Sequence, residues 1–179
     1  QQHVVSLAAG PSSTNPLRYA AGLLAVAVGD DDNSRLYWEL VDSGRADIAE
    51  LGHNDFDGTG TWTTYLCCEP DDVPSNLESL AGVLRGVNRN GITDEELAMA
   101  KNKVATAVVL AGERPMGRLS SLGGNWVYAR EYRSIQDELA SVQGVSTSDI
   151  RRLLDEFPLS LTSTVGIGPL SELPEVPGT

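Results

Sequence analysis

The chain is poor in cysteine: it has only two, the neighbours Cys67 and Cys68. Adjacent side chains of an extended strand point to opposite faces, so a bridge between these two thiols would be strained. The pair also lacks the spacing of a metal-binding Cys-x-x-Cys motif. We therefore expect two free thiols, one buried and one half-buried, and the sequence leaves the redox compartment open.

Positive charge is also scarce, because 13 lysines and arginines stand against 25 acidic residues, for a net charge of −12. Such a chain repels nucleic acid and anionic lipid unless its cations cluster tightly. The densest group of arginines lies among acids on predicted helices, where pairing along the helix and solvation account for it: Arg114, Arg118, Arg130, Arg133, Arg151 and Arg152. We therefore predict no nucleic-acid partner and no membrane partner.

Long hydrophobic runs are absent as well. The longest, at residues 19–28, is about half of the ~20 residues that a membrane-spanning helix needs. The 41% apolar content is enough for one continuous core, so we expect a single domain over residues 1–168 and a Pro-rich tail or linker at 169–179. The chain begins with Gln1 and has no signal-peptide pattern, which favours a natural product that starts further upstream, and its localisation stays undetermined.

The patterns of known catalytic and cofactor sites are missing. Gly-x-Ser-x-Gly is absent, and the glycines at 58–60 and 123–124 lack the lysine and spacing of a phosphate-binding loop. The two histidines, His3 and His53, belong to neither His-x-x-Glu-His nor His-Glu-x-x-His, the spacings of zinc peptidases. A cation site at residues 53–57, or a small-molecule enzyme built on His53, stays open as an alternative.

The acidic run at residues 30–32 resembles a calcium or magnesium loop only in composition. Three adjacent acids lack the alternating spacing and the glycine of an EF-hand loop. We predict instead that Asp32 or Asn33 caps a helix over residues 34–42. A metal site at the acidic run is the alternative.

The first part of the chain predicts a sheet with a helix on it. Residues 3–10 are predicted as a short buried strand, and residues 16–28 as a deeply buried helix. The dipeptide Asp57-Gly58 predicts a tight turn between two strands, at 47–55 and 59–69. Both faces of the second of these strands are fairly apolar, which is typical of an inner strand.

The later part of the chain is mainly helical. A capping box at Thr93–Glu96 begins a helix to about residue 112, and its apolar stripe is expected to pack on a sheet. Pro115 must break or kink that helix. Trp126 and the nearby Tyr132 are predicted to join an aromatic cluster in the core rather than a ligand platform.

Two further helices and a strand complete the predicted fold. Ser134 and Ser146 are predicted to cap two short helices, the second over residues 147–156, and residues 161–168 to form a final strand. Together the elements predict the α+β class, with an antiparallel sheet covered on one face by helices.

Four segments, in this order, resemble the pitrilysin/insulinase/mitochondrial processing peptidase superfamily, whose members carry an inverted zinc motif. They are residues 33–44 (NSRLYWELVDSG), 57–62 (DGTGTW), 91–103 (GITDEELAMAKNK) and 145–151 (VSTSDIR). Each segment is a loose match by itself. In the correct order and on the expected elements they make a fairly specific signal, and the resemblance covers about residues 2–169.

The resemblance implies the LuxS/MPP-like metallopeptidase half-domain, in the version that binds no zinc. It implies that this chain holds no catalytic residue and no metal, with zinc in another domain of the parent protein, which would be a zinc metalloendopeptidase. The implied partners are that zinc-binding domain, on the same polypeptide or a paired subunit, and a peptide substrate. The implied function is a non-catalytic scaffold and wall of the substrate chamber; the alternative is a structural or assembly subunit without hydrolytic activity.

One departure from the family concerns substrate binding. Active members place an arginine and a tyrosine after the Ser-Arg-Leu helix to hold the substrate, and Val41 and Ile48 stand at those positions here. Direct substrate contact from Val41 and Ile48 is therefore not expected. Either the chain belongs to a subgroup without the pair, or the alignment differs by a shift in register.

Overall fold

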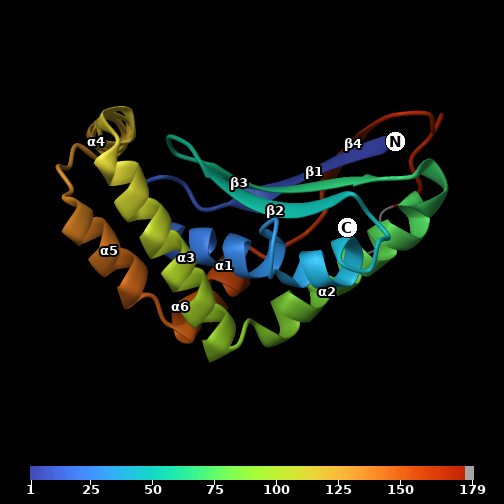
Figure 1. The fold of residues 1–179 in the computed structure, drawn as a ribbon, viewed down its shortest axis with the longest axis horizontal. Helices are drawn as coiled ribbons and strands as arrows, with labels where there is room; N and C mark the ends of the chain where they lie inside the picture. The colour runs from blue at the N-terminus through green and yellow to red at the C-terminus, as the bar shows by residue number, and fades with distance from the viewer. Residues whose placement is uncertain (176–179) are drawn as a thin grey trace.

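The protein consists of a sheet layer and a helix layer, as the computed structural model of residues 1–175 shows (Figure 1). Residues 176–179, the end of the predicted Pro-rich tail, lie outside the described residues. The four strands are β1 (Gln2–Gly10), β2 (Ile48–Asp55), β3 (Gly60–Cys68) and β4 (Ser163–Ile167), in the order β2-β3-β1-β4. All neighbouring strands are antiparallel, and the α+β prediction is confirmed.

The hairpin between β2 and β3 forms where the Asp-Gly dipeptide predicted it. The Phe56 amide donates to the Thr59 carbonyl at 2.8 Å, and Gly58 has a φ of +71°. A positive φ is the backbone conformation that glycine adopts without strain. β3 lies between β2 and β1, so its prediction as an inner strand is confirmed.

β1 is buried on one face only, which corrects the prediction of a short buried strand. Val4 is 2% exposed, but Val5 and Leu7 are 36% and 42% exposed. The reason is that successive side chains of a strand alternate between the two faces. The helices lie against one face of the sheet, so every second residue of β1 points away from them (Figure 1).

The core fills the space between the sheet and four helical segments. These are α1 (Arg18–Gly29), the π-helical turn η1 (Tyr37–Val41), α2 (Val73–Asn90, preceded by the 3-10 turn Pro70–Asp72) and α6 (Thr147–Glu156). The largest buried side chains of these segments, together with that of Leu36 just before η1, include Leu23, Leu24, Leu36, Leu40, Leu77, Leu80, Ile150 and Leu153. On the sheet side Trp62 is 1% exposed, and its indole nitrogen donates to the Phe157 carbonyl at 3.1 Å. That bond satisfies the only polar atom of a fully buried ring.

The helix predicted over residues 34–42 is capped by Ser34, not by Asp32 or Asn33. The Ser34 hydroxyl accepts a hydrogen bond from the Tyr37 amide at 3.1 Å and donates to the Asp30 carbonyl at 2.7 Å. Asn33 has a φ of +52°, so it lies in the left-handed region just outside the helix. The helix itself is π-helical at Tyr37–Val41, where the Asp42 amide donates to the Tyr37 carbonyl.

The remaining helices are α3 (Asp94–Glu113), α4 (Pro115–Ala129) and α5 (Ile135–Gly144). The capping box of Thr93 is confirmed at the start of α3, and Ser134 and Ser146 are confirmed as the caps of α5 and α6, where each forms a capping box as well. The break at Pro115 is confirmed as well. α3, however, packs mainly on α1 and α5 and not on the sheet, because α1 already covers the sheet at that place. In Figure 1, α3, α4 and α5 stand together at one end of the molecule.

The predicted aromatic cluster in the core is wrong. Trp126 is 56% exposed and Tyr132 is 72% exposed, and no residue of α4 is buried. The side of α4 toward the rest of the protein carries small and polar residues instead, including Gly117, Gly124 and Asn125. None of the helices in the described part of the chain is long and apolar enough to cross a membrane.

Candidate functional site

The side of the sheet that faces away from the helices is a broad, partly apolar surface. We call it the open sheet face, and the strand register assigns to it His3, Val5, Leu7, Ile48, Glu50, Thr63, Tyr65, Val165 and Ile167. Val165 and Ile167 are 65% and 74% exposed, and paired residues of neighbouring strands point to the same side. The surface thus extends over all four strands, with Val5 of β1 between Tyr65 of β3 and Val165 of β4.

A histidine–tyrosine pair is the main polar feature of the open sheet face. His3 Nδ1 lies 2.8 Å from the Tyr65 hydroxyl, and the two rings are nearly parallel, with centroids 6.2 Å apart. Desolvation raises the pKa of Tyr65 above its ordinary value, so the phenol stays protonated at neutral pH. The face can therefore offer apolar contact and a few hydrogen bonds to a ligand, but Tyr65 does not act as an ionised nucleophile.

Val41 and Ile48, which the resemblance aligns with the substrate-binding pair of active family members, lie in different surroundings. Val41 ends the π-helical turn and packs, half-buried, against the core. Ile48 begins β2 and is paired with Cys67, so it belongs to the open sheet face. Both are aliphatic, and neither side chain can donate a hydrogen bond to a peptide.

His53 is held by the protein's own backbone. Its Nε2 lies 2.9 Å from the Pro11 carbonyl, and since a carbonyl only accepts, Nε2 carries the proton of the neutral ring. The ring also packs on Trp62, with centroids 5.2 Å apart. Burial lowers the pKa of His53, so the imidazole is neutral at pH 7.

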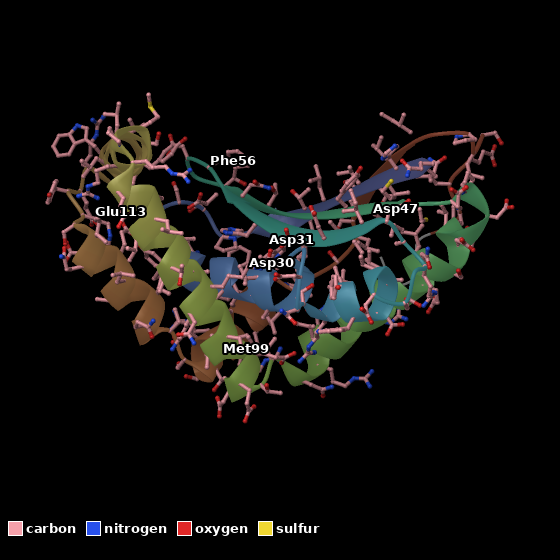
Figure 2. The ribbon with its side chains drawn as sticks, viewed as in Figure 1. Asp30, Asp31, Asp47, Phe56, Met99 and Glu113 are labelled. Carbon is pink, nitrogen blue, oxygen red and sulfur yellow. The ribbon has the colours of Figure 1, made fainter. Side chains whose placement is uncertain are left out.

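The acidic run at residues 30–32 is paired with a lysine of α3. Lys103 Nζ lies 2.7 Å from Asp30 and 3.5 Å from Asp31, and it also contacts Asp32. Hydrogen bonds from Asp30 and Asp32 raise the pKa of Lys103, which keeps the ammonium charged. Within residues 1–175 these aspartates are the only group of three or more potential ligands whose atoms lie within 4.8 Å of one another. The ammonium occupies the position that a cation would take (Figure 2 labels Asp30 and Asp31).

Both cysteines are free, as predicted, but both are buried, at 2% and 1% exposed. Cys67 points to the open sheet face, and its cross-strand neighbours His3 and Ile48 flank it, which explains why it is not half-exposed. Desolvation raises the pKa of Cys68. A buried thiol with a raised pKa is a poor nucleophile, so Cys68 serves packing, and Cys67 is buried as well.

A cavity of about 460 Å³ separates α4 from the hairpin end of the sheet. His53 lines it, and so does a network centred on Glu138. Glu138 accepts hydrogen bonds from the Tyr19 hydroxyl at 2.6 Å, from Asn125 at 2.9 Å and from Arg133 at 3.1 Å. Because the carboxylate is fully partnered, the network is suited to holding α1, α4 and α5 together rather than to proton transfer.

Sequence reasoning missed both the open sheet face and this network. The two-residue period of a strand over residues 3–10 is a possible signal for the open sheet face. The outward positions include the apolar Val5 and Leu7, however, so the sequence pattern suggests that they are core residues. The network has no local signal, because Tyr19 and Glu138 are 119 residues apart.

Comparison with family models gives a match over residues 1–104 to the family described as "Peptidase M16 inactive domain". Among curated proteins, an uncharacterized zinc protease of Streptomyces coelicolor is 28% identical over 173 residues, which is 96% of this chain and 38% of the relative. The chain thus spans well under half the length of that relative.

Solved structures share the fold. The inactive peptidase domain of a zinc protease homologue from Bordetella parapertussis superposes with a TM-score of 0.81 at 19% identity, covering 99% of this chain and 95% of that one. A protease from Helicobacter pylori also gives a TM-score of 0.81, at 18% identity, but the match covers 94% of this chain and only 41% of the longer protein.

Proposed function

Because this chain belongs to the peptidase M16 inactive-domain family, we propose that it is a non-catalytic scaffold that forms one wall of the substrate chamber of a zinc metallopeptidase. The open sheet face is the observation that carries the proposal. It leaves Leu7, Val165 and Ile167 between 42% and 74% exposed on one continuous surface. A flat apolar surface of this kind contacts an unfolded peptide without demanding a particular sequence.

The zinc and the catalytic residues of the proposed enzyme would reside in another domain, on the same polypeptide or on a paired subunit. The length of the relatives supports this, because the matched part is 38% of the Streptomyces coelicolor protein and 41% of the Helicobacter pylori protein. In our proposal residues 1–168 form one domain and residues 169–179 lead away from it. Leu170 and Leu173 pack against the core, and the Leu170 amide donates to Gln2, so the proposed linker starts on the domain surface.

A structural or assembly subunit is the second candidate. Val41 and Ile48 favour it, since two aliphatic residues replace the pair that would hold the peptide backbone in active relatives. In that case the parent protein would hold neither zinc nor peptidase activity.

Photo-cross-linking tests the chamber wall in the full-length polypeptide. A photo-reactive phenylalanine analogue is placed at Leu7 on the open sheet face or, as a control, at Met99 on α3, which is 56% exposed (Figure 2). With a zinc-site variant that binds peptide without cleaving it, we expect cross-links from position 7 and none from position 99. If the full-length polypeptide with an intact zinc site is an active peptidase but its zinc-site variant gives no cross-link from position 7, the proposal that the open sheet face is a chamber wall is contradicted.

Zinc dependence separates the two candidates. The full-length polypeptide is expected to cleave unfolded peptide in a chelator-sensitive reaction, and residues 1–179 alone are expected to cleave nothing with added zinc. A full-length protein without zinc and without cleavage would favour the structural subunit. Chelator-sensitive cleavage by the isolated chain would overturn both candidates.

A further inference from the structure

Helix α4 turns its apolar side away from the rest of the protein. Met116, Leu119, Trp126 and Val127 are 70%, 63%, 56% and 62% exposed. Their spacing places them on one side of an α-helix, and we call them the α4 outer face. The neighbouring Tyr132, 72% exposed, follows the helix.

The opposite side of α4 carries mainly small and polar residues, together with Arg118 and Tyr128. Gly117, Ser121, Gly124 and Asn125 line the cavity between α4 and the sheet. Asn125 is tied there by its hydrogen bond to Glu138. α4 is therefore amphipathic, but its apolar side faces outward. The apolar stripe of a surface helix normally faces the core. An apolar stripe directed outward on an anchored helix marks an interaction site.

The composition of this surface matches that of protein–protein interfaces. Met, Trp, Tyr and Arg are enriched at such interfaces, and Trp, Tyr and Arg dominate their energetic centres. Besides Met116, Trp126 and Tyr132, the segment carries the exposed Arg114 and Arg130. The apolar residues of the open sheet face are mainly valine and isoleucine, which fits the weaker contact expected of a chamber wall.

We infer that the α4 outer face is the surface on which the zinc-binding domain docks. The inference rests on the proposed function. The length of the relatives supports this occupant, because the fold described here is 41% of the Helicobacter pylori chain and the rest of that chain is available to cover a surface. Charge specifies the partner further, because the exposed Arg114 and Arg130 flank the two ends of α4 in a chain of net charge −12. The docking surface of the zinc-binding domain is therefore apolar with acidic residues at its rim.

Oxidative footprinting tests the docking surface, because the three tryptophans form a matched set. Trp126 and Trp38 are 56% and 55% exposed, and Trp62 is 1% exposed. Hydroxyl-radical oxidation of each indole is measured by mass spectrometry in the isolated chain and in the full-length polypeptide. We expect Trp126 to react roughly fivefold more slowly in the full-length polypeptide, because the centre of an interface excludes water. Trp38 is expected to react at the same rate in both, and Trp62 slowly in both.

A variant links the protection to the patch. Leu119→Glu places a charge in the α4 outer face and is expected to restore Trp126 oxidation in the full-length polypeptide. Met99→Glu, at a residue of similar exposure on α3, is expected to leave the protection unchanged.

The outcomes separate this inference from the proposed function. An active zinc peptidase in which Trp126 reacts as in the isolated chain overturns the docking surface and leaves the chamber wall standing. Equal protection of Trp38 and Trp126 overturns it too, since the shielding would not be specific. Protection of Trp126 in the isolated chain that grows with protein concentration assigns the patch to a second copy instead. A full-length protein without zinc and activity removes both proposals.

Discussion

Helices α2 and α4 are similar in length, at 18 and 15 residues, but α2 buries seven residues and α4 buries none. Both carry a proline in the first turn, and both repeat apolar residues at helical spacing. The apolar side of α2 faces the sheet, whereas that of α4 faces away from it. The comparison teaches that a periodic pattern identifies a helix and its apolar side, while the arrangement of the other elements decides whether that side is core.

Leucine truncations in the two helices should give the largest difference. Leu80 of α2 is 0% exposed and Leu119 of α4 is 63% exposed. Leu80→Ala leaves a cavity and should lower the free energy of unfolding by about 2–5 kcal/mol. Leu119→Ala should change it by less than ~0.5 kcal/mol, because nothing in the isolated chain packs over it. Urea unfolding of the two variants measures both, and equal losses would mean that α4 is packed like α2.

Glycine replacements sharpen the same contrast between core and α4. A Cβ at Gly29, at the end of α1, would lie 2.1 Å from the Leu51 amide nitrogen, whereas a Cβ at Gly123 of α4 meets nothing within 4 Å. Gly29→Ala should therefore cost ~1–3 kcal/mol through overpacking. Gly123→Ala should stabilise α4 by about 0.5–1 kcal/mol, because alanine loses less backbone entropy in a helix. Thermal unfolding with circular dichroism detects the opposite signs; a loss from Gly123→Ala would show that the space beside Gly123 is not open.

Features that depend on hydrogen bonds between near neighbours were predictable from the sequence. The turn at Asp57-Gly58, the capping box at Thr93 and the caps at Ser134 and Ser146 lie where they were expected, because each closes over three or four residues. The resemblance to a known family located Val41 and Ile48, but their surroundings came from the fold.

Features that depend on which element covers which were not predictable. Trp126 is a large aromatic residue of the kind that usually lies in a core, and only the position of α4 at the end of the molecule leaves it exposed. Val5 is the same kind of case, because one face of the sheet has no helix over it. The Glu138 network joins residues from α1, α4 and α5, and no local pattern connects them.

A third test compares how the first turns of α3 and α4 are held by side chains. Glu96 closes the capping box of α3 and accepts two hydrogen bonds from Arg35, at 2.7 and 2.8 Å, whereas α4 has no side-chain cap. Glu96→Gln should cost about 1–2 kcal/mol, since it weakens charge-assisted bonds of a partly buried group. Glu95→Gln, on the exposed side of the same turn, is the control and should stay within ~0.5 kcal/mol.

The pH dependence of Glu96 follows from the same contacts. The hydrogen bond from Arg35 is the main reason why the pKa of Glu96 lies below its ordinary value near 4.5. The stabilisation by Glu96 is therefore complete above pH 4.5 and is lost as the pH falls through the lower pKa of the folded protein. Acid unfolding of the wild type should be steeper than that of Glu96→Gln, and parallel curves would mean that the ion pair is not formed.

The smallest expected effect concerns His53, which lines the cavity beneath α4. Burial holds its pKa below the ordinary value of 6.5, so below that pH the unfolded chain binds a proton that the folded protein does not. Stability should therefore fall as the pH drops below 6.5, and His53→Gln should reduce this slope. The measurement is urea unfolding between pH 5 and 7.5.

The same pH dependence also tests whether α4 packs on the rest of the isolated chain when no partner is present. If α4 were detached from the isolated chain, water would reach His53, its pKa would return toward the ordinary value, and the slope assigned to it would vanish. Loss of the slope together with a neutral Leu119→Ala would show that α4 needs its docking partner to close the cavity. A slope of the predicted sign with a neutral Leu119→Ala would show instead that α4 is held from its inner side, through Asn125 and Glu138, while its outer face stays free.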